Sequence, residues 1–206
     1  MRYMLGLLCG LLSLIASADV LIVGDSISAA YGIDKEQGWV TLLEQRVAEE
    51  CPGMAVNNAS VSGETTAGGL ARLPVLLQRH APAIVVIELG GNDGLRGMPP
   101  AQMARNLRGM IAASREAGAE PLLFGMLIPP NYGAAYNAMF ESAFRDVAEA
   151  EEIPFVPFFL EGVGDDPALM QDDGIHPTAA AQPVLLDNAW AVLASAVRDH
   201  CEADDV

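Results

Sequence analysis

The chain has 206 residues and a formal net charge of −16, with 27 acidic and 11 basic side chains. So acidic a protein is a poor partner for nucleic acids, because phosphate binding rests on Lys and Arg, and anionic membrane surfaces should repel it. Hydrophobic residues make up 51% of the chain, which is enough for one domain with a sizeable core.

The first 18 residues have the pattern of a secretory signal. Arg2 precedes an uncharged, mostly apolar run over residues 4–15, and Ala16-Ser17-Ala18 supplies the small residues that a signal peptidase needs. We predict cleavage after Ala18, which leaves one domain over residues 19–206 with a charge of −17, in the periplasm or secreted. The apolar run is shorter than the roughly 20 residues that cross a bilayer, so we expect no stable membrane insertion after cleavage; a retained anchor is the alternative.

Apolar runs and helical patterns alternate along the rest of the chain. The predicted strands cover residues 20–23, 54–58, 83–89, 121–127 and 155–156, and the predicted helices cover 39–50, 70–79, 103–114, 140–148 and 184–197. This alternation predicts an α/β protein, with a parallel five-stranded sheet between two helical layers. Right-handed crossovers favour the flavodoxin-like strand order 2-1-3-4-5.

Four polar or glycine positions lie just after predicted strands, and these are Ser26, Gly63, Asn92 and Asn131. Ligands of such sheets bind beyond the carboxyl ends of the strands. We therefore expect these four residues at one edge of the sheet.

Cys51 and Cys201 are the cysteines of the predicted mature chain. Each ends a helix, and in the flavodoxin-like order the first and last helices are neighbours on one face. Both cysteines should emerge at the edge opposite the ligand edge, which predicts a disulfide between them in an exported protein. Two free thiols are the alternative.

The clearest chemical signal is a serine at the end of the first strand with an acid and an imidazole near the other end of the chain. Ser26 lies in Val23-Gly24-Asp25-Ser26, and the other two groups lie in Asp173-Gly174-Ile175-His176. A serine hydroxyl needs a base to take its proton. His176 is the candidate base, and Asp173 can hold its other nitrogen as a donor.

Each of these residues also has a reading without chemistry. Ser26 could cap a helix, and Asp173 with His176 could form a self-satisfied turn or a weak metal site. His80 and His200 fit better as cations at helix C-termini. Ser28 stands where the G-x-S-x-G elbow has its second glycine, which disfavours an ordinary α/β-hydrolase.

Acyl transfer also needs hydrogen-bond donors aimed at the developing oxyanion. Gly63, in Ser60-Val61-Ser62-Gly63-Glu64-Thr65, can expose its backbone N–H, and Asn92, in Gly90-Gly91-Asn92-Asp93-Gly94, can donate from its carboxamide. A flexible turn and an Asx-turn are the respective alternatives.

Several blocks carry a resemblance to a known family over nearly the whole predicted mature chain. They are Gly24-Asp25-Ser26, Asn58-Ala59-Ser60, Gly63, the run 69–74, the run 88–97, Pro130-Asn131-Tyr132-Gly133 and the run 170–177. In order and spacing they resemble the SGNH (GDSL-type) hydrolases, and most closely the bacterial thioesterase, arylesterase and lysophospholipase group.

The resemblance implies a serine esterase with a Ser-His-Asp acyl-enzyme mechanism. Ser26 would be the nucleophile, His176 the general base and then acid, and Asp173 the residue that orients the imidazole. The N–H groups of Ser26 and Gly63, with the Asn92 side chain, would form the oxyanion hole. The substrates would be acyl esters, lysophospholipids and acyl thioesters. We expect a monomer that needs no metal or organic cofactor.

A loop after the fourth strand resembles the acyl-recognition loop of this group. Its candidate substrate-binding residues are Met126, Leu127, Ile128, Pro130, Asn131 and Tyr132. The chain departs from the group's pattern at Ala134 and Ala135, where related enzymes carry two arginines. Without these cations we expect neutral or zwitterionic esters to be better substrates than coenzyme A thioesters.

Two other functions are compatible with this sheet. A carbohydrate O-deacetylase would use the same nucleophile, but the apolar segment Met126-Leu127-Ile128 argues against it. A flavodoxin-like binding module without catalysis would need a phosphate-cradling loop after the first strand, where this chain has the carboxylate of Asp25. Reaction with a fluorophosphonate separates an esterase from the binding module.

Overall fold

The computed structural model describes residues 19–204, and the predicted signal segment lies outside them. Five parallel strands form one sheet in the order 2-1-3-4-5, so the predicted topology is confirmed. The strands are β1 (Val20–Gly24), β2 (Val56–Asn58), β3 (Ile84–Glu88), β4 (Glu120–Phe124) and β5 (Phe155–Val156). The helices are α1 (Trp39–Glu50), α2 (Thr66–His80), α3 (Gly91–Leu95), α4 (Pro100–Glu116), α5 (Ala134–Glu151) and α6 (Gln182–Asp204), with short 3-10 turns at Lys35–Gln37, Pro130–Tyr132 and Ala179–Ala181.

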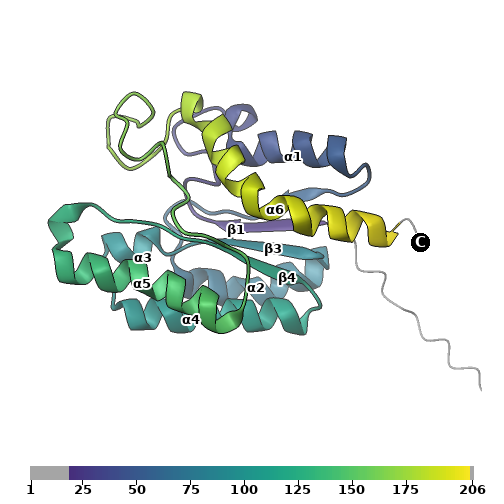
Figure 1. The fold of residues 1–206 in the computed structure, drawn as a ribbon, viewed down its shortest axis with the longest axis horizontal. Coiled ribbons are helices and arrows are strands. Elements are labelled where there is room, and N and C mark those ends of the chain that lie inside the picture. Colours follow the sequence, from purple (N-terminus) through teal and green to yellow (C-terminus); the bar gives the residue numbers. More distant parts are fainter. Residues whose placement is uncertain (1–18, 205–206) are drawn as a thin grey trace, which may run out of the picture.

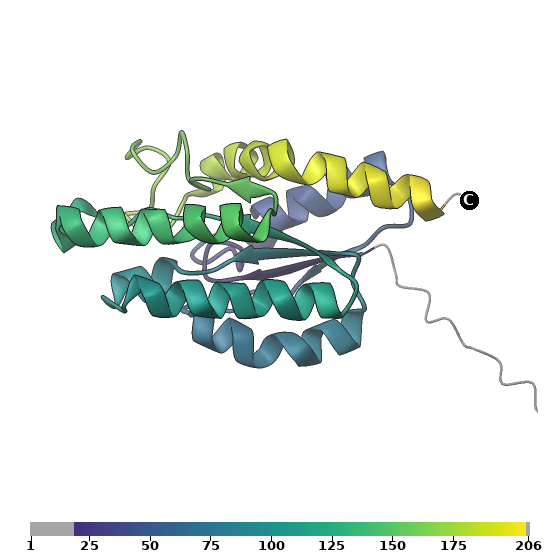
Figure 2. The ribbon, with the colours of Figure 1, turned by 60° about the horizontal axis from the view of Figure 1, so that its bottom comes forward.

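The sheet is covered on both faces. Helices α1 and α6 pack on one side, and α2, α4 and α5 pack on the other (Figures 1 and 2). Every residue of β1 and β3 is buried, which explains why these strands are runs of apolar residues rather than alternating patterns. No helix of residues 19–204 is long and apolar enough to span a bilayer.

Strand β4 ends three residues earlier than the sequence suggests. Its neighbour β5 has only two residues and is followed by Pro157, so pairing stops where the Gly125 N–H donates to the Val156 carbonyl at 2.7 Å. The Phe159 N–H then donates to the carbonyl of Gly125 at 2.9 Å. The prediction of strand up to residue 127 is therefore wrong, and residues 125–129 leave the sheet at its carboxyl edge as a loop.

Helix α3 occupies the glycine-rich segment after β3, where no helix was expected from the sequence. Gly90 precedes it with a φ of +124°, a conformation that disfavours residues with a Cβ. Gly94, inside the helix, lies so close to Ile128 and Phe140 that a Cβ there would approach both to 2.6 Å. These glycines let α3 lie tightly between β3, the 125–129 loop and α5.

A disulfide joins Cys51, at the end of α1, to Cys201 in α6. The two Cα atoms are 5.6 Å apart although the residues are 150 positions apart in the sequence. Helices α1 and α6 lie side by side on one face, and their ends emerge at the edge where the strands begin (Figure 1). The bridge is therefore far from the carboxyl ends of the strands.

Candidate active site

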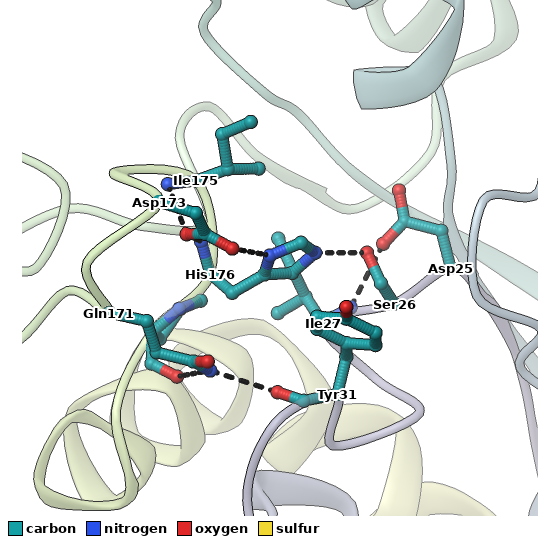
Figure 3. A network of polar contacts seen from close by, with 9 residues as sticks. Asp25, Ser26, Ile27, Tyr31, Gln171, Asp173, Ile175 and His176 are labelled. Carbon is teal, nitrogen blue, oxygen red and sulfur yellow. Dashed lines mark hydrogen bonds and ion pairs between the residues drawn. The ribbon is translucent and has the colours of Figure 1, made fainter.

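Ser26, His176 and Asp173 form a continuous hydrogen-bonded line at the carboxyl edge of the sheet (Figure 3). The Ser26 Oγ lies 2.9 Å from the His176 Nε2, and the His176 Nδ1 lies 2.6 Å from the Asp173 Oδ2. Ser26 can donate to an unprotonated Nε2 while the Nδ1–H donates to the carboxylate. This is the tautomer in which the imidazole can act as a base toward the hydroxyl.

Local hydrogen bonds fix the turn that carries Ser26. The Asp25 Oδ1 accepts from the Ile27 N–H at 3.0 Å, and the carbonyls of Asp25 and Ser26 accept from the N–H groups of Ala29 and Tyr31. Asp25 is 3% exposed and Ser26 is 9% exposed, so the turn is anchored in the core while the hydroxyl lies at the surface of a cavity.

Local hydrogen bonds also fix the loop that carries His176. The Asp173 Oδ1 accepts from the N–H groups of Ile175 and His176, and Gly174 between them has a φ of +66°. The hydrogen bond from the His176 ring, with these two N–H donors, lowers the pKa of Asp173 to about 2. Asp173 therefore stays ionised at neutral pH, as an acceptor for the Nδ1–H must.

Asn92, from α3, reaches the same turn. Its Nδ2 donates to the Asp25 Oδ2 at 2.9 Å, which fixes the direction of the carboxamide. Its neighbour Asp93 accepts from the N–H and the Oγ of Thr66 at 2.9 Å and 2.5 Å, and so ties α3 to the start of α2. The carboxamide is thus held on a rigid short helix beside Ser26.

Two buried carboxyl groups lie behind Ser26, and sequence reasoning assigned no role to either. Glu88, at the end of β3, is fully buried, and its Oε2 accepts from the Ser28 Oγ at 2.6 Å and the Asp25 N–H at 3.3 Å. Burial raises the pKa of Asp25 to about 6, and burial with the nearby charge of Asp25 raises the pKa of Glu88 well above its usual range. The signal in the sequence was a glutamate ending an apolar, fully buried strand.

Gly63 lies on the loop after β2 with a φ of +76°, which favours glycine. The Val61 N–H donates to the Gly24 carbonyl at 3.1 Å, and the Arg96 guanidinium donates to the Gly63 carbonyl at 2.9 Å. These bonds hold the loop against the end of β1 and against α3. Within residues 19–204, the N–H groups of Ser26 and Gly63 donate to no other residue, so both can bond a ligand.

A mostly apolar cavity of about 530 Å³ opens beside Ser26 and His176. Met126, Leu127, Ile128 and Pro130 form one wall, and the segment 158–175 forms the other through Phe158, Leu160, Met170 and Ile175. Of the loop residues expected to bind substrate, Asn131 and Tyr132 are not among those that line the cavity. The Tyr132 hydroxyl instead donates to the Leu95 carbonyl at 2.7 Å. Gly63 also lies outside the lining, whereas Asn92 belongs to it.

Sequence reasoning missed the second wall because its residues lie in a segment without regular periodicity. It also missed Tyr31, whose ring lies against His176 with 4.5 Å between the centroids. Among residues 19–204, no group of three or more His, Cys, Asp or Glu side chains is arranged to hold a metal ion.

Comparison with known proteins agrees with this architecture. The model of the GDSL-like lipase/acylhydrolase family matches residues 22–183. Esterase TesA of Pseudomonas aeruginosa is 55% identical over 193 residues, covering 91% of this chain and 96% of the relative. Thioesterase 1/protease 1/lysophospholipase L1 of Escherichia coli K12 is 46% identical, covering 84% and 82%.

A solved structure of the psychrotrophic esterase EstA from Pseudoalteromonas, inhibited by monoethylphosphonate, superimposes with a TM-score of 0.82. It is 41% identical, and the match covers 86% of this chain and 97% of that chain. The chain belongs to the GDSL-like lipase/acylhydrolase family.

Proposed function

We propose that this protein is a serine esterase that hydrolyses acyl esters and thioesters of apolar acids through an acyl-enzyme formed on Ser26. The supporting observation is the hydrogen-bonded line from Asp173 through His176 to Ser26 at the mouth of an apolar cavity. The names of the relatives, an esterase and a thioesterase/lysophospholipase, point to the same class of reaction.

The proposed mechanism has two steps. The Ser26 oxygen attacks the acyl carbon while its proton passes to the His176 Nε2, and the ring's Nδ1–H remains bonded to Asp173. The imidazolium then gives that proton to the departing alcohol or thiol. Water attacks the acyl-enzyme by the same route, which releases the acid and restores the Ser26 hydroxyl.

We propose that the N–H groups of Ser26 and Gly63 and the Nδ2 of Asn92 donate hydrogen bonds to the oxyanion. The bond from Asn92 to Asp25 uses one hydrogen of the carboxamide, so the second remains for the substrate oxygen. Removing a donor of this kind costs on the order of 10²–10³ in kcat, and we expect Asn92→Ala to fall in that range.

A fluorophosphonate tests the assignment of the nucleophile. The protein should be labelled once, and peptide mapping should place the adduct on Ser26. Ser26→Ala should fold with unchanged circular dichroism, resist labelling and lose ester hydrolysis. Labelling at another residue, or turnover retained by Ser26→Ala, would contradict the proposal. Ser60→Ala, which changes a serine on the loop after β2, is the matched control and should still be labelled at Ser26.

The cavity favours neutral or zwitterionic esters over coenzyme A thioesters. No Lys or Arg lines it within the described chain, while Asp165 does. Ala134 and Ala135 are exposed at the start of α5, where cations would be needed for an anionic headgroup. The net charge of −16 also repels a polyanionic leaving group.

Measurement of kcat/KM for octanoyl-CoA and for a neutral octanoyl ester decides the point. We expect the neutral ester to be the better substrate at physiological salt. Added salt should narrow the difference, because it screens the repulsion of the anionic thioester. A preference for octanoyl-CoA at physiological salt would refute this part of the proposal, without touching the role of Ser26.

We further propose that the mature protein begins at Asp19 and acts as a monomer in an oxidising compartment. The composition of residues 1–18 supports export, and the pairing of Cys51 with Cys201 suits an exported chain. Cell fractionation, mass spectrometry of the mature N-terminus and light scattering test these three points.

A further inference from the structure

Tyr31 lies on the imidazole of His176. The two ring centroids are 4.5 Å apart and the ring planes meet at 40°. Figure 3 shows both side chains beside Ser26. Tyr31 is 52% exposed, so this is not simply a core side chain that happens to touch the site. Tyr31 and His176 also border a narrow crevice beside Ser26 that has no room for a water molecule. The tyrosine ring therefore covers part of one face of the imidazole.

The two hydrogen bonds of the imidazole only weakly restrain motion of the ring perpendicular to its plane. Asp173 and Ser26 contact the ring nitrogens, and both bonds act in or near the plane of the ring. They fix the direction of the ring within that plane but resist a swing out of it only weakly. A side chain lying against the face supplies the missing restraint.

The backbone around Tyr31 holds the ring in this place at a cost. Ala30, directly before it, has a φ of +57°, a left-handed conformation that is unfavourable for a residue with a Cβ. The Tyr31 N–H donates to the Ser26 carbonyl at 3.0 Å, so the strained turn closes back onto the residue that carries the nucleophile. Strain kept beside a reacting group is a reason to look for a function there.

A second bond connects Tyr31 to the loop of the imidazole. The Gln171 Nε2 donates to the Tyr31 carbonyl and to the Pro177 carbonyl, each at 2.9 Å, and so joins two segments far apart in the sequence. The Gln171 N–H donates to the His176 carbonyl at 2.7 Å. Gly32 leaves room for the Gln171 side chain, because a Cβ there would lie 2.2 Å from its Oε1. Gln171 thus connects the backbone of Tyr31 to the loop that carries His176.

We propose that Tyr31 is a positioning residue for His176, whose ring keeps the imidazole between Asp173 and Ser26 and stabilises the imidazolium formed when Ser26 gives up its proton. An aromatic face within about 6 Å of a cation attracts it, and the attraction grows where water is excluded. The inference rests on the proposed function, because it needs His176 to become charged during the reaction. It concerns the ring of Tyr31 and not its hydroxyl.

The test compares Tyr31→Phe with Tyr31→Leu, since the first keeps the ring and the second keeps only apolar volume. Tyr31→Phe should stay within about twofold of the wild type, and Tyr31→Leu should lose roughly fivefold in kcat, the upper end for a cation–aromatic contact at a partly exposed site. The same loss should appear with acetyl and octanoyl esters and in the rate of fluorophosphonate labelling. KM should change little.

Proton NMR gives a readout that does not depend on turnover. The carbon-bound ring protons of His176 should carry a ring-current shift in the wild type and in Tyr31→Phe, and should lose it in Tyr31→Leu. Equal losses of activity in both variants would assign the role to the hydroxyl and overturn the proposal. It would also be overturned by a loss in Tyr31→Leu that grows with acyl length and spares fluorophosphonate labelling, because that result marks a substrate contact.

Ser26→Ala, measured alongside, separates the two levels of inference. If Ser26→Ala retains turnover, the proposed function itself fails. If Ser26→Ala is inactive while Tyr31→Leu matches the wild type, only the role of Tyr31 fails.

Discussion

The carboxyl groups of Asp25 and Glu88 show how single residues behind Ser26 can shape the site. The Asp25 carboxyl bonds the Ile27 N–H through one oxygen and the Asn92 carboxamide through the other. Glu88 accepts two hydrogen bonds through its Oε2, whereas its Oε1 has no partner among the residues described. The pair thus orders the turn of Ser26 and the direction of Asn92 at the cost of burying two acids.

This cost predicts a pH dependence of stability. The pKa of Asp25 is raised from its ordinary 3.8 to about 6, mainly by burial. Between these values the folded protein holds a proton that the unfolded chain releases, so the free energy of unfolding should fall as the pH rises from about 4 to 6. A shift of this size corresponds to about 3 kcal/mol.

Asp25→Asn removes the titrating group and serves as the reference. Urea unfolding of both proteins at several pH values between 4 and 7 gives the difference in their free energies of unfolding. We expect the free energy of unfolding of the wild type to fall relative to that of Asp25→Asn as the pH rises through this range. The difference should level off at higher pH. Parallel curves for the two proteins would show that Asp25 does not titrate there.

At the scale of elements, helix α3 connects the candidate oxyanion donor Asn92 to the apolar cavity beside Ser26. Asn92 lies on its inner side, while Gly94 packs against Ile128 of the cavity wall and Phe140 of α5. The Tyr136 hydroxyl donates to the Met98 carbonyl at 2.7 Å just beyond this helix. Displacement of α3 should therefore change both the donor and the wall.

Gly94→Ala tests this coupling, since its methyl group would lie 2.6 Å from atoms of Ile128 and Phe140. We expect a loss of about 1–3 kcal/mol in the free energy of unfolding from overpacking, together with a lower kcat. Gly109→Ala, in the middle of α4, is the matched control, because its nearest contacts are the movable methyl groups of Leu70 at 3.0 Å and 3.3 Å. It should keep its activity, and unfolding and ester hydrolysis measured in parallel decide between these outcomes. An unaffected Gly94→Ala would contradict the tight fit of α3.

At the scale of the whole molecule, the candidate catalytic residues and the disulfide lie at opposite edges of the sheet. The bridge from Cys51 to Cys201 spans 150 positions and closes most of the described chain into one loop. Such a loop limits the freedom of the unfolded chain and should stabilise the fold by about 4–5 kcal/mol in the entropic account.

The double variant Cys51→Ser with Cys201→Ser should therefore unfold at a lower urea concentration. Its free energy of unfolding should be lower than that of the wild type by about 4–5 kcal/mol. Its kcat under native conditions should equal that of the wild type, because the bridge lies at the edge of the sheet opposite the candidate active site. Detection of two free thiols in the unfolded, unreduced wild-type protein would show that the disulfide does not form. A large loss of kcat in the variant would show that the two edges are coupled.

Apolar runs and parallel-sheet topology are regular, so the sequence was sufficient for the strand order and for placing Ser26 and Asn92 at one edge. Asp173 and His176 were assigned from the chemistry of their Asp-x-x-His pattern and from the family resemblance, not from the topology. The sequence could not give the end of β4, which depends on the length of its partner β5. Nor could it give the wall around Phe158 or the contact of Tyr31 with His176. Those depend on how irregular loops cross, and such loops carry no periodic signal.

The separation of the two edges also bears on how the protein could be used. Helix α6 ends on the side where the strands begin (Figure 1). The cavity lined by Ser26 and His176 lies at the edge where the strands finish. A tether attached beyond this helix would leave the entrance facing away from its support. Immobilisation through the carboxyl-terminal end should accordingly preserve access for bulky, poorly soluble esters better than random coupling through surface carboxylates, which are abundant in this acidic chain.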